Sequence, residues 1–331
     1  MSALLIRPIV LARAPVLSQT RFRLAPTVRS FRLSAMASPN VPTLKLNDGH
    51  ELPVLAYGLG TANYKGTRKE FDQKIVDSTV TAIKLGYTHL DGAEVYGNED
   101  ELGAAIKAGG VAREKLYVVT KYDPKPTGSV EDAFALSLQK LGVDYVDLYL
   151  IHSPYWKGVT PQQLQSRWAE LEAIQASGRA RSIGLSNFLQ EHVEHVLATA
   201  KVVPAIDQIE FHPYLQHGDL VPYLHKHGIA VSAYAPLTAI MRASPGPLDP
   251  TYAQLAAKYG VSDSAVALRW AIDRGIVAIT TSSSEKRLQS YLTDLASFQL
   301  TVAEVDAISN IGHEKHFRAF WTAQFAPEDR S

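Results

Sequence analysis

Eight short apolar runs alternate with longer segments of helical periodicity, and no other feature of the sequence restricts the possible folds as strongly. The apolar runs are rich in β-branched residues, so we expect them to be strands. They are Val54–Thr61, Tyr87–Asp91, Leu116–Thr120, Tyr145–Ile151, Ala180–Leu185, Ala205–Phe211, Ile229–Ala235 and Ile276–Thr280. Repeated strand–helix units imply a parallel sheet with right-handed crossovers. Eight units in roughly 270 residues match the usual size of a closed (β/α)8 barrel, or TIM barrel.

An open, doubly wound sheet is the main alternative to the barrel. That fold requires a glycine-rich turn between its first strand and first helix. Residues 58–63, Gly-Leu-Gly-Thr-Ala-Asn, fit such a turn only in part because the third small residue is missing. The sequence therefore favours the barrel, as a single domain over residues 41–331.

Helix and turn signals support this organisation. Helices are expected over Val130–Leu141, Pro161–Ser177 and Ser262–Arg274, each with an ordinary start or stop residue. Before the barrel, Thr43–Leu46 and Glu51–Val54 flank Asn-Asp-Gly, a good hairpin turn. We expect this N-terminal β-hairpin to close the bottom of the barrel. The tail after residue 312 is expected to be irregular.

The first 36 residues differ in composition from the rest of the chain. Residues 1–36 contain six arginines and no acid, and the first acid is Asp48. An arginine-rich, acid-free start is typical of a mitochondrial transit peptide. Met36 lies where a compact cytosolic enzyme could begin, so the mitochondrion and the cytoplasm are both left open. In either case we expect residues 1–36 to be a leader outside the fold, disordered or a transit peptide.

Composition argues against several classes of function. The formal net charge is zero, which gives no reason to expect a nucleic-acid partner. No apolar run approaches the 18 residues that suggest a membrane span. The chain has no cysteine, and His192 and His195, one helical turn apart, have no evident third ligand, so no metal site is expected. We expect a monomer whose partner is a small molecule.

Polar side chains end three consecutive strands of the expected barrel. The second strand ends at Asp91, the third is followed by Lys121 and the fourth by His152, while Tyr96 lies five residues beyond Asp91. The C-terminal ends of barrel strands form one rim, so these side chains are expected to meet.

The chemistry of this group is that of a proton donor. Asp91 is the natural partner of a buried Lys121, and a nearby ammonium is expected to lower the pKa of the Tyr96 phenol. A neutral His152 could orient a substrate oxygen. The group suits protonation of an oxygen while a hydride reaches the carbon.

Two segments carry a resemblance to a known family. Residues 86–99, Gly-Tyr-Thr-His-Leu-Asp-Gly-Ala-Glu-Val-Tyr-Gly-Asn-Glu, and 150–154, Leu-Ile-His-Ser-Pro, resemble segments of the aldo-keto reductase superfamily, and the resemblance extends over Thr43–Ser309. It implies that Tyr96 is the general acid of a tetrad with Asp91, Lys121 and His152. It also implies a nicotinamide cofactor bound by Ser186, Asn187, Gln208, Tyr234, Pro236 and Leu237.

The segment expected at the adenosine end of the cofactor departs from the family pattern. Where the family usually has Ile-Pro-Lys-Ser, residues 279–284 are Ile-Thr-Thr-Ser-Ser-Ser, followed by Arg287 as in the family and Tyr291 in place of an asparagine. This variant resembles a fungal subgroup of NADPH-dependent reductases of α-keto amides and conjugated polyketones, including ketopantoyl lactone. The resemblance implies NADPH, with NADH as the open alternative, bound by Thr281, Ser282, Ser283 and Arg287.

The expected substrate is a small carbonyl compound. Many relatives have tryptophan at the positions of Ala62 and Ser153, which we expect, with His152, to contact the substrate. A pocket that is less aromatic there fits compact dicarbonyls. We therefore predict an NAD(P)H-dependent reductase of small activated ketones and aldehydes. A non-catalytic, NADPH-sensing interaction subunit of the same fold is the alternative.

Overall fold

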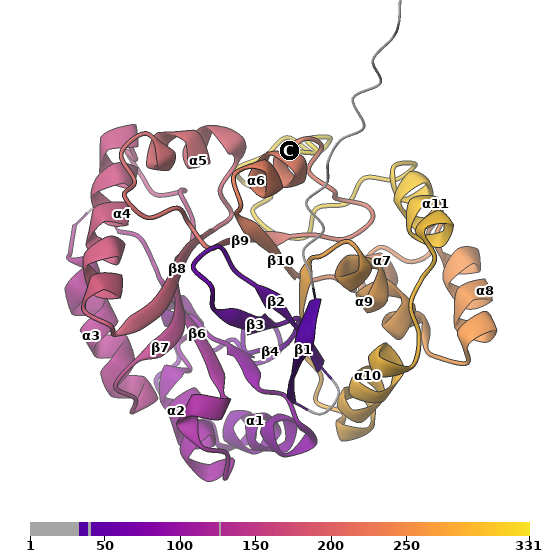
Figure 1. Cartoon of the computed structure of the whole chain (residues 1–331), viewed down its shortest axis with the longest axis horizontal. Helices are drawn as coiled ribbons and strands as arrows, with labels where there is room; N and C mark the ends of the chain where they lie inside the picture. Colours follow the sequence, from indigo (N-terminus) through magenta and orange to yellow (C-terminus); the bar gives the residue numbers. More distant parts are fainter. Residues whose placement is uncertain (1–32, 39–40, 126) are drawn as a thin grey trace, which may run out of the picture. The chain divides into compact units, whose positions relative to one another are not determined.

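A computed structural model describes residues 33–38, 41–125 and 127–331 of the chain. Within them, eight parallel strands form a closed barrel in the order β10-β11-β4-β5-β6-β7-β8-β9 (Figure 1). The strands are β4 (Leu55–Gly58), β5 (His89–Asp91), β6 (Tyr117–Tyr122), β7 (Val146–Ile151), β8 (Ala180–Ser186), β9 (Ile206–Glu210), β10 (Ala230–Tyr234) and β11 (Val277–Thr280). Each lies within or overlaps one of the eight predicted runs, so the (β/α)8 barrel is confirmed.

Helices surround this barrel, as the ring of ribbons in Figure 1 shows. They are α1 (Gln73–Leu85), α2 (Glu99–Ala108), α3 (Val130–Leu141), α4 (Pro161–Ala176), α5 (Gln190–Leu197), α6 (Leu220–Lys226), α9 (Asp263–Asp273) and α10 (Glu285–Ser297). Local signals set their ends. Helix α4, for example, begins after Thr160, whose hydroxyl accepts from the backbone N–H of Gln163 in a capping box. One face of α4, with Trp168 and Leu171, is buried in the core.

Three helices and two short 3-10 turns lie outside the eight expected strand–helix units. Helices α7 (Thr238–Met241) and α8 (Asp249–Tyr259) stand between β10 and α9, and α11 (Val302–Gly312) follows α10. The 3-10 turns are η1 (Glu94–Tyr96) and η2 (Arg113–Lys115). The tail beyond α11 has no helix or strand, as predicted.

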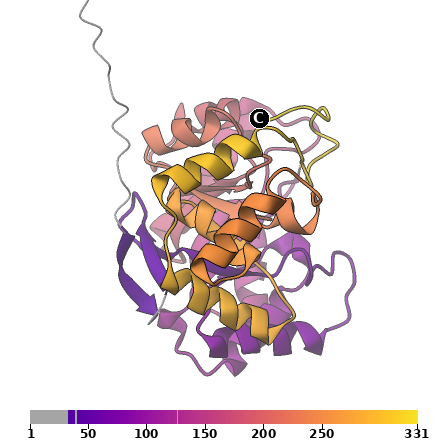
Figure 2. The same ribbon diagram turned by 90° about the vertical axis from the view of Figure 1, so that its right-hand side faces the viewer.

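The predicted N-terminal hairpin is present at the bottom of the barrel. Strands β2 (Val41–Lys45) and β3 (Glu51–Pro53) pair antiparallel. The carbonyl of Pro53 lies 2.9 Å from Nδ1 of His89, the first residue of β5. The Asn47 amide donates to the carbonyl of Pro204, just before β9. These contacts place the hairpin across the N-terminal ends of the strands. Figure 2 shows it at one end of the barrel and the irregular C-terminal tail, in yellow, at the other.

A further strand, β1 (Leu33–Ser38), pairs antiparallel with β2. Sheet pairing therefore begins within the last residues of the predicted leader, before the expected boundary at Val41. The free edge of β2 supplies the backbone donors and acceptors for this strand. All these elements belong to one unit, Phe31–Ser331. The other unit, Met1–Ser30, lies outside the described residues, so the transit peptide stays a prediction.

In the part of the chain that the structure describes, no helix is both long and apolar enough to cross a bilayer.

Candidate active site

A cavity of about 740 Å³ opens at the C-terminal ends of the barrel strands, away from the hairpin. Nearly every element of the barrel contributes to its wall. The predicted site residues that line it are Asp91, Tyr96, His152, Ser186, Asn187, Gln208, Tyr234, Pro236, Leu237, Thr281, Ser282 and Arg287. Residues far apart in the sequence are thus brought to one space because parallel strands all end at the same rim.

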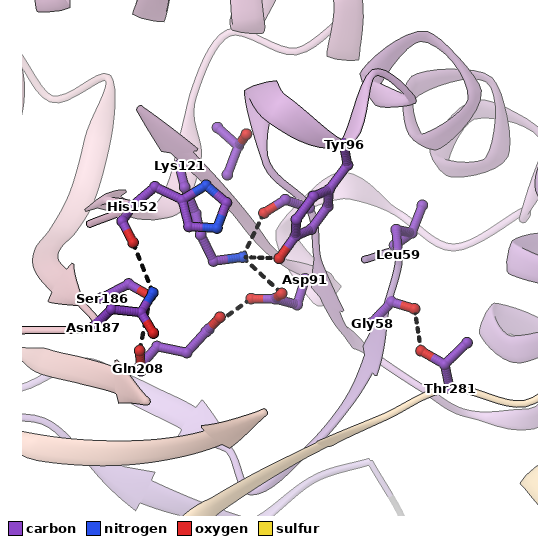
Figure 3. Close-up of polar contacts among 12 residues, drawn as sticks. Gly58, Leu59, Asp91, Tyr96, Lys121, His152, Ser186, Asn187, Gln208 and Thr281 are labelled. Carbon is purple, nitrogen blue, oxygen red and sulfur yellow. Dashed lines mark hydrogen bonds and ion pairs between the residues drawn. The ribbon is translucent and has the colours of Figure 1, made fainter. Parts of the chain in front are cut away.

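Lys121 lies at the centre of the polar contacts beneath this cavity (Figure 3). Its fully buried ammonium is 2.7 Å from Asp91 Oδ1, 2.7 Å from the carbonyl oxygen of Gly92 and 3.4 Å from the Tyr96 hydroxyl. Asp91 ends β5, Lys121 is in β6, and Tyr96 ends the turn η1. A buried ammonium is stable only when several acceptors surround it, and these three oxygens meet that need.

His152 follows β7 and completes the group. Its ring centroid is 5.5 Å from that of Tyr96, and the two rings meet edge to face. Burial, helped by the positive charge of Lys121, lowers the pKa of His152 to about 3. The imidazole is therefore neutral at neutral pH and can share a hydrogen bond with a substrate oxygen. We refer to Asp91, Tyr96, Lys121 and His152 as the strand-end cluster.

The expected direction of the Tyr96 pKa is wrong. Burial raises this pKa above its usual value, and the negative charge of Asp91 adds to the rise. Lys121 acts in the predicted direction, lowering the pKa, but its effect is the smaller one. The sequence identifies the nearby charge and not the loss of solvent around the phenol, which is why the prediction failed. Tyr96 consequently holds its proton at neutral pH.

Gln208 and Ser186 extend the strand-end cluster along the rim. The Gln208 amide donates to Asp91 Oδ2 over 2.9 Å, so both oxygens of that carboxylate are used. The Ser186 hydroxyl donates to the backbone carbonyl of Gln208 over 2.7 Å. Strands β5, β8 and β9 are thereby connected at their C-terminal ends.

Asn187 continues the same chain of hydrogen bonds. Its amide nitrogen donates to the Ser186 hydroxyl and to the carbonyl oxygen of His152, each over 2.9 Å. Its amide oxygen accepts from the Tyr234 hydroxyl over 2.7 Å. The backbone of Asn187 has a φ of 63°, a left-handed conformation that asparagine tolerates better than most residues. Side chains predicted to hold a nicotinamide carboxamide therefore lie beside His152.

A second group of predicted residues lies where β11 leads into α10. The Thr281 hydroxyl donates to the carbonyl of Gly58, and the Arg287 guanidinium donates from Nε to the Ser282 hydroxyl over 3.0 Å. Ser284 caps α10 by accepting from the backbone N–H of Arg287. A helix N-terminus offers backbone N–H groups, and a guanidinium beside it adds a positive charge and further donors. Such an arrangement is suited to bind a phosphate. We refer to Thr281, Ser282 and Arg287 as the α10 corner.

Besides Lys121, which lies beneath the cavity, three predicted residues do not line it. Ser283 and Ala62 are exposed and do not line it. Ser153 is buried, and its hydroxyl accepts from the backbone N–H of Tyr155 rather than facing the cavity. The expectation that Ala62 and Ser153 shape the substrate pocket is therefore not supported by their positions. A residue directly next to one that lines the cavity can face away from it, because neighbouring side chains point in different directions at the end of a strand.

Aromatic rings reach the cavity from other segments, and the sequence did not identify them as site residues. Tyr64 comes from the β4–α1 loop, with its ring 6.3 Å from that of Tyr96, and Phe320 and Trp321 come from the C-terminal tail. The charged side chains of Asp123 and Arg242 also line the cavity. All five lie on loops or at helix ends, where no local periodicity indicates which way a side chain points.

Over residues 33–38, 41–125 and 127–331, no three aspartate, glutamate or histidine side chains are grouped so as to hold a metal ion.

Comparison with known proteins agrees with this geometry. The model of the Aldo/keto reductase family matches residues 56–313. An NAD/NADP-dependent indole-3-acetaldehyde reductase of Schizosaccharomyces pombe is 38% identical, covering 82% of this chain and 96% of its own length. An NADPH-dependent alpha-keto amide reductase of Saccharomyces cerevisiae is 37% identical over 83% of this chain and 93% of its own. The crystal structure of a Bombyx mori aldo-keto reductase in complex with NADP superposes with a TM-score of 0.73 at 36% identity, covering 83% of this chain and 94% of its own.

Proposed function

The chain belongs to the aldo/keto reductase family and is a carbonyl reductase of that family, and from this premise we propose that it uses NADPH to reduce small activated ketones and aldehydes. One observation carries the proposal. The buried Lys121 ammonium contacts both Asp91 and the Tyr96 hydroxyl beneath a cavity, with a neutral His152 beside them.

The residues around the cavity fit a nicotinamide dinucleotide. Ser186, Asn187 and Gln208 present hydroxyl and amide groups beside the strand-end cluster, as a carboxamide requires. Tyr234, held by Asn187, presents an aromatic ring to the cavity. Pro236 and Leu237 continue the wall, and the α10 corner offers a guanidinium and hydroxyls for a phosphate. When bound, the cofactor supplies the hydride.

The chain's own residues handle the oxygen of the substrate. A neutral His152 hydrogen-bonds the carbonyl oxygen and orients it toward Tyr96. The Tyr96 hydroxyl, which burial keeps protonated, gives its proton to that oxygen as negative charge develops there. The Lys121 ammonium stabilises the phenolate left behind, and Asp91 holds the ammonium in place.

The preference for NADPH rests on the α10 corner. Arg287 lines the cavity, and the N-terminus of α10 lies beside it, so a phosphate on the adenosine ribose would find a positive charge and free N–H groups. The relatives bear names that include NADPH or NAD/NADP, so NADH is the alternative cofactor.

The proposed substrates are activated dicarbonyl compounds, including α-keto amides, conjugated polyketones and ketopantoyl lactone. A carbonyl next to a second electron-withdrawing group accepts a hydride more readily. The yeast relative named for α-keto amides supports this class. The aromatic rings of Tyr64, Phe320 and Trp321 suit a flat or apolar substituent next to the reacting group.

The test measures the rate of reduction of a panel of carbonyl compounds with NADPH and with NADH. Oxidation of the cofactor is monitored by its absorbance. We expect faster oxidation of NADPH with diketones, α-keto amides and ketopantoyl lactone than with ketones that have no activating group. In Tyr96→Phe, kcat/KM should fall by about 10²- to 10⁴-fold, because the general acid is lost. NADPH binding should persist in this variant. Binding without turnover in the unaltered chain would instead favour an NADPH-sensing subunit, and full activity in Tyr96→Phe would contradict the proposed proton donor.

A further inference from the structure

A buried carboxylate at the rim of the barrel holds the C-terminal tail. Glu210 is the last residue of β9 and is 1% exposed. Its Oε1 accepts from the backbone N–H of Ala319 over 2.8 Å, and its Oε2 accepts from that of Phe320 over 3.0 Å. Two consecutive peptide groups of an otherwise irregular segment are thus bound by one side chain, 109 residues away in the sequence.

The residues held in this way form a wall of the cavity. Phe320 and Trp321 both line it, whereas Glu210 does not. The Phe320 ring meets the Tyr234 ring edge to face, with centroids 5.4 Å apart. Trp321 has a φ of 58°, so the chain turns sharply directly after the bound peptide groups. The tail supplies the wall, and Glu210 fixes where the tail runs.

We propose that Glu210 is a positioning residue that sets the substrate affinity of the cavity by holding Phe320 and Trp321 in place. This inference rests on the proposed reductase function. A tail without helix or strand has much conformational freedom, which must be given up when it forms a wall. Hydrogen bonds to a buried carboxylate compensate for that loss more strongly than bonds to a neutral acceptor.

The surroundings of Glu210 require a carboxylate. Besides the two peptide N–H groups, His212 Nε2 lies 3.1 Å from Oε1, and burial lowers the pKa of His212, which favours a neutral ring that donates from Nε2. Both carboxylate oxygens therefore face donors. A glutamine at this position would turn its NH₂ group toward at least one of them, whichever way the amide is oriented.

The tail just before the wall has other attachments. Lys315 donates from Nζ to the carbonyls of Ala243 and Pro245, and the Phe317 N–H donates to the carbonyl of Tyr214. These contacts are independent of Glu210. Loss of the Glu210 contacts should therefore loosen the segment around residues 318–321, where ring packing of Phe320 on Tyr234 and of Trp321 on Tyr155 remains, while leaving residues 315–317 attached.

Glu210→Gln in the full chain tests the inference through steady-state kinetics with a diketone. We expect KM to rise by about 10- to 100-fold, the effect of one lost hydrogen bond to a charged group. The value of kcat and the dissociation constant of NADPH should each change by less than about threefold, because the strand-end cluster and the α10 corner are untouched.

Asp147→Asn is the matched control. Asp147 is 2% exposed near the start of β7, at the opposite end of the barrel, and accepts from the backbone N–H of Val118 over 2.9 Å. Its amide variant should lower the melting temperature and leave KM unchanged. Ala319→Pro is a second variant, made at a partly exposed position of the tail instead of inside the barrel. It removes the peptide N–H that donates to Glu210 Oε1 and should reproduce the rise in KM even if Glu210→Gln folds poorly.

A combined variant distinguishes action through the tail from any other route. If Glu210 acts by placing Phe320 and Trp321, adding Glu210→Gln to Phe320→Ala/Trp321→Ala should raise KM by no more than about twofold beyond Phe320→Ala/Trp321→Ala alone. Effects that multiply in full in the combined variant would overturn the inference.

Limited chymotrypsin digestion followed by mass spectrometry reports release of the tail without any substrate. Cleavage after Trp321 should be faster in Glu210→Gln and Ala319→Pro than in the unaltered chain, and unchanged in Asp147→Asn. Tail release in a chain with no carbonyl turnover would refute the proposed function and leave the anchor intact. Normal turnover with KM and cleavage unchanged in both variants would refute the anchor alone.

Discussion

The strand-end cluster and the α10 corner line the same cavity but are built in opposite ways. Lys121 and Asp91 are buried, and the ammonium and both carboxylate oxygens are hydrogen-bonded by neighbouring residues. Arg287 is exposed, and its Nε donates to the Ser282 hydroxyl. Charges inside a barrel need exact partners, whereas charges at an exposed helix start are also solvated by water. The difference leads us to expect a larger loss of stability from a change in the cluster than from a change at the corner.

The largest expected difference between the two regions is in stability. Asp91→Asn leaves the buried Lys121 ammonium without its negative partner, so the free energy of unfolding should fall by about 3–5 kcal/mol. Arg287→Ala, on an exposed side chain, should change it by less than about 0.5 kcal/mol. Urea denaturation of both variants measures this contrast. Equal stability losses would show that burial does not separate the two regions.

Cofactor selection should depend on the α10 corner. Arg287→Ala removes the guanidinium expected to meet the extra phosphate of NADPH, so the dissociation constant of NADPH should rise by about 10- to 100-fold. The dissociation constant of NADH and the kcat with saturating cofactor should be nearly unchanged. Quenching of tryptophan fluorescence on titration with each cofactor provides the values. An equal loss for both cofactors would place Arg287 outside the phosphate site.

Features of the fold and of the site differ in how well they could be predicted from the sequence alone. The barrel and the meeting of Asp91, Lys121 and His152 were predictable, because strand periodicity also fixes where each strand ends. Contacts such as that of Glu210 with Ala319 were not, since nothing local in either segment indicates the other. The direction of the Tyr96 pKa also escaped prediction, because it depends on how much of the molecule excludes water from the phenol.

The pH dependence should be weak around neutrality. Reduction needs protonated Tyr96 and neutral His152. The pKa of Tyr96 is raised, so the phenol loses its proton only in strongly alkaline solution, and the pKa of His152 is lowered to about 3. Between about pH 6 and pH 9, kcat/KM for reduction should vary by less than about threefold. Oxidation of the product alcohol, which needs deprotonated Tyr96, should become faster as the pH rises. A reduction rate that falls steeply above pH 7 would mean that Lys121 outweighs burial.

Smaller effects on NADPH binding than that of Arg287 are expected for the two neighbouring hydroxyls of Ser282 and Ser283. The Ser282 hydroxyl accepts from Arg287 Nε over 3.0 Å and from the backbone N–H of Ser284 over 3.1 Å. Ser282→Ala should therefore raise the dissociation constant of NADPH by about 2- to 10-fold, the effect of a neutral hydrogen bond, because Arg287 loses its support.

Ser283→Ala, one residue further along, should change the same dissociation constant by less than about twofold, because Ser283 is exposed and outside the cavity wall. The resemblance to the fungal reductases alone would give the two serines equal roles. Isothermal titration calorimetry of the two variants with NADPH measures this difference. It tests whether the direction of each side chain, rather than membership of a run of hydroxyl residues, decides which serine contributes to cofactor binding.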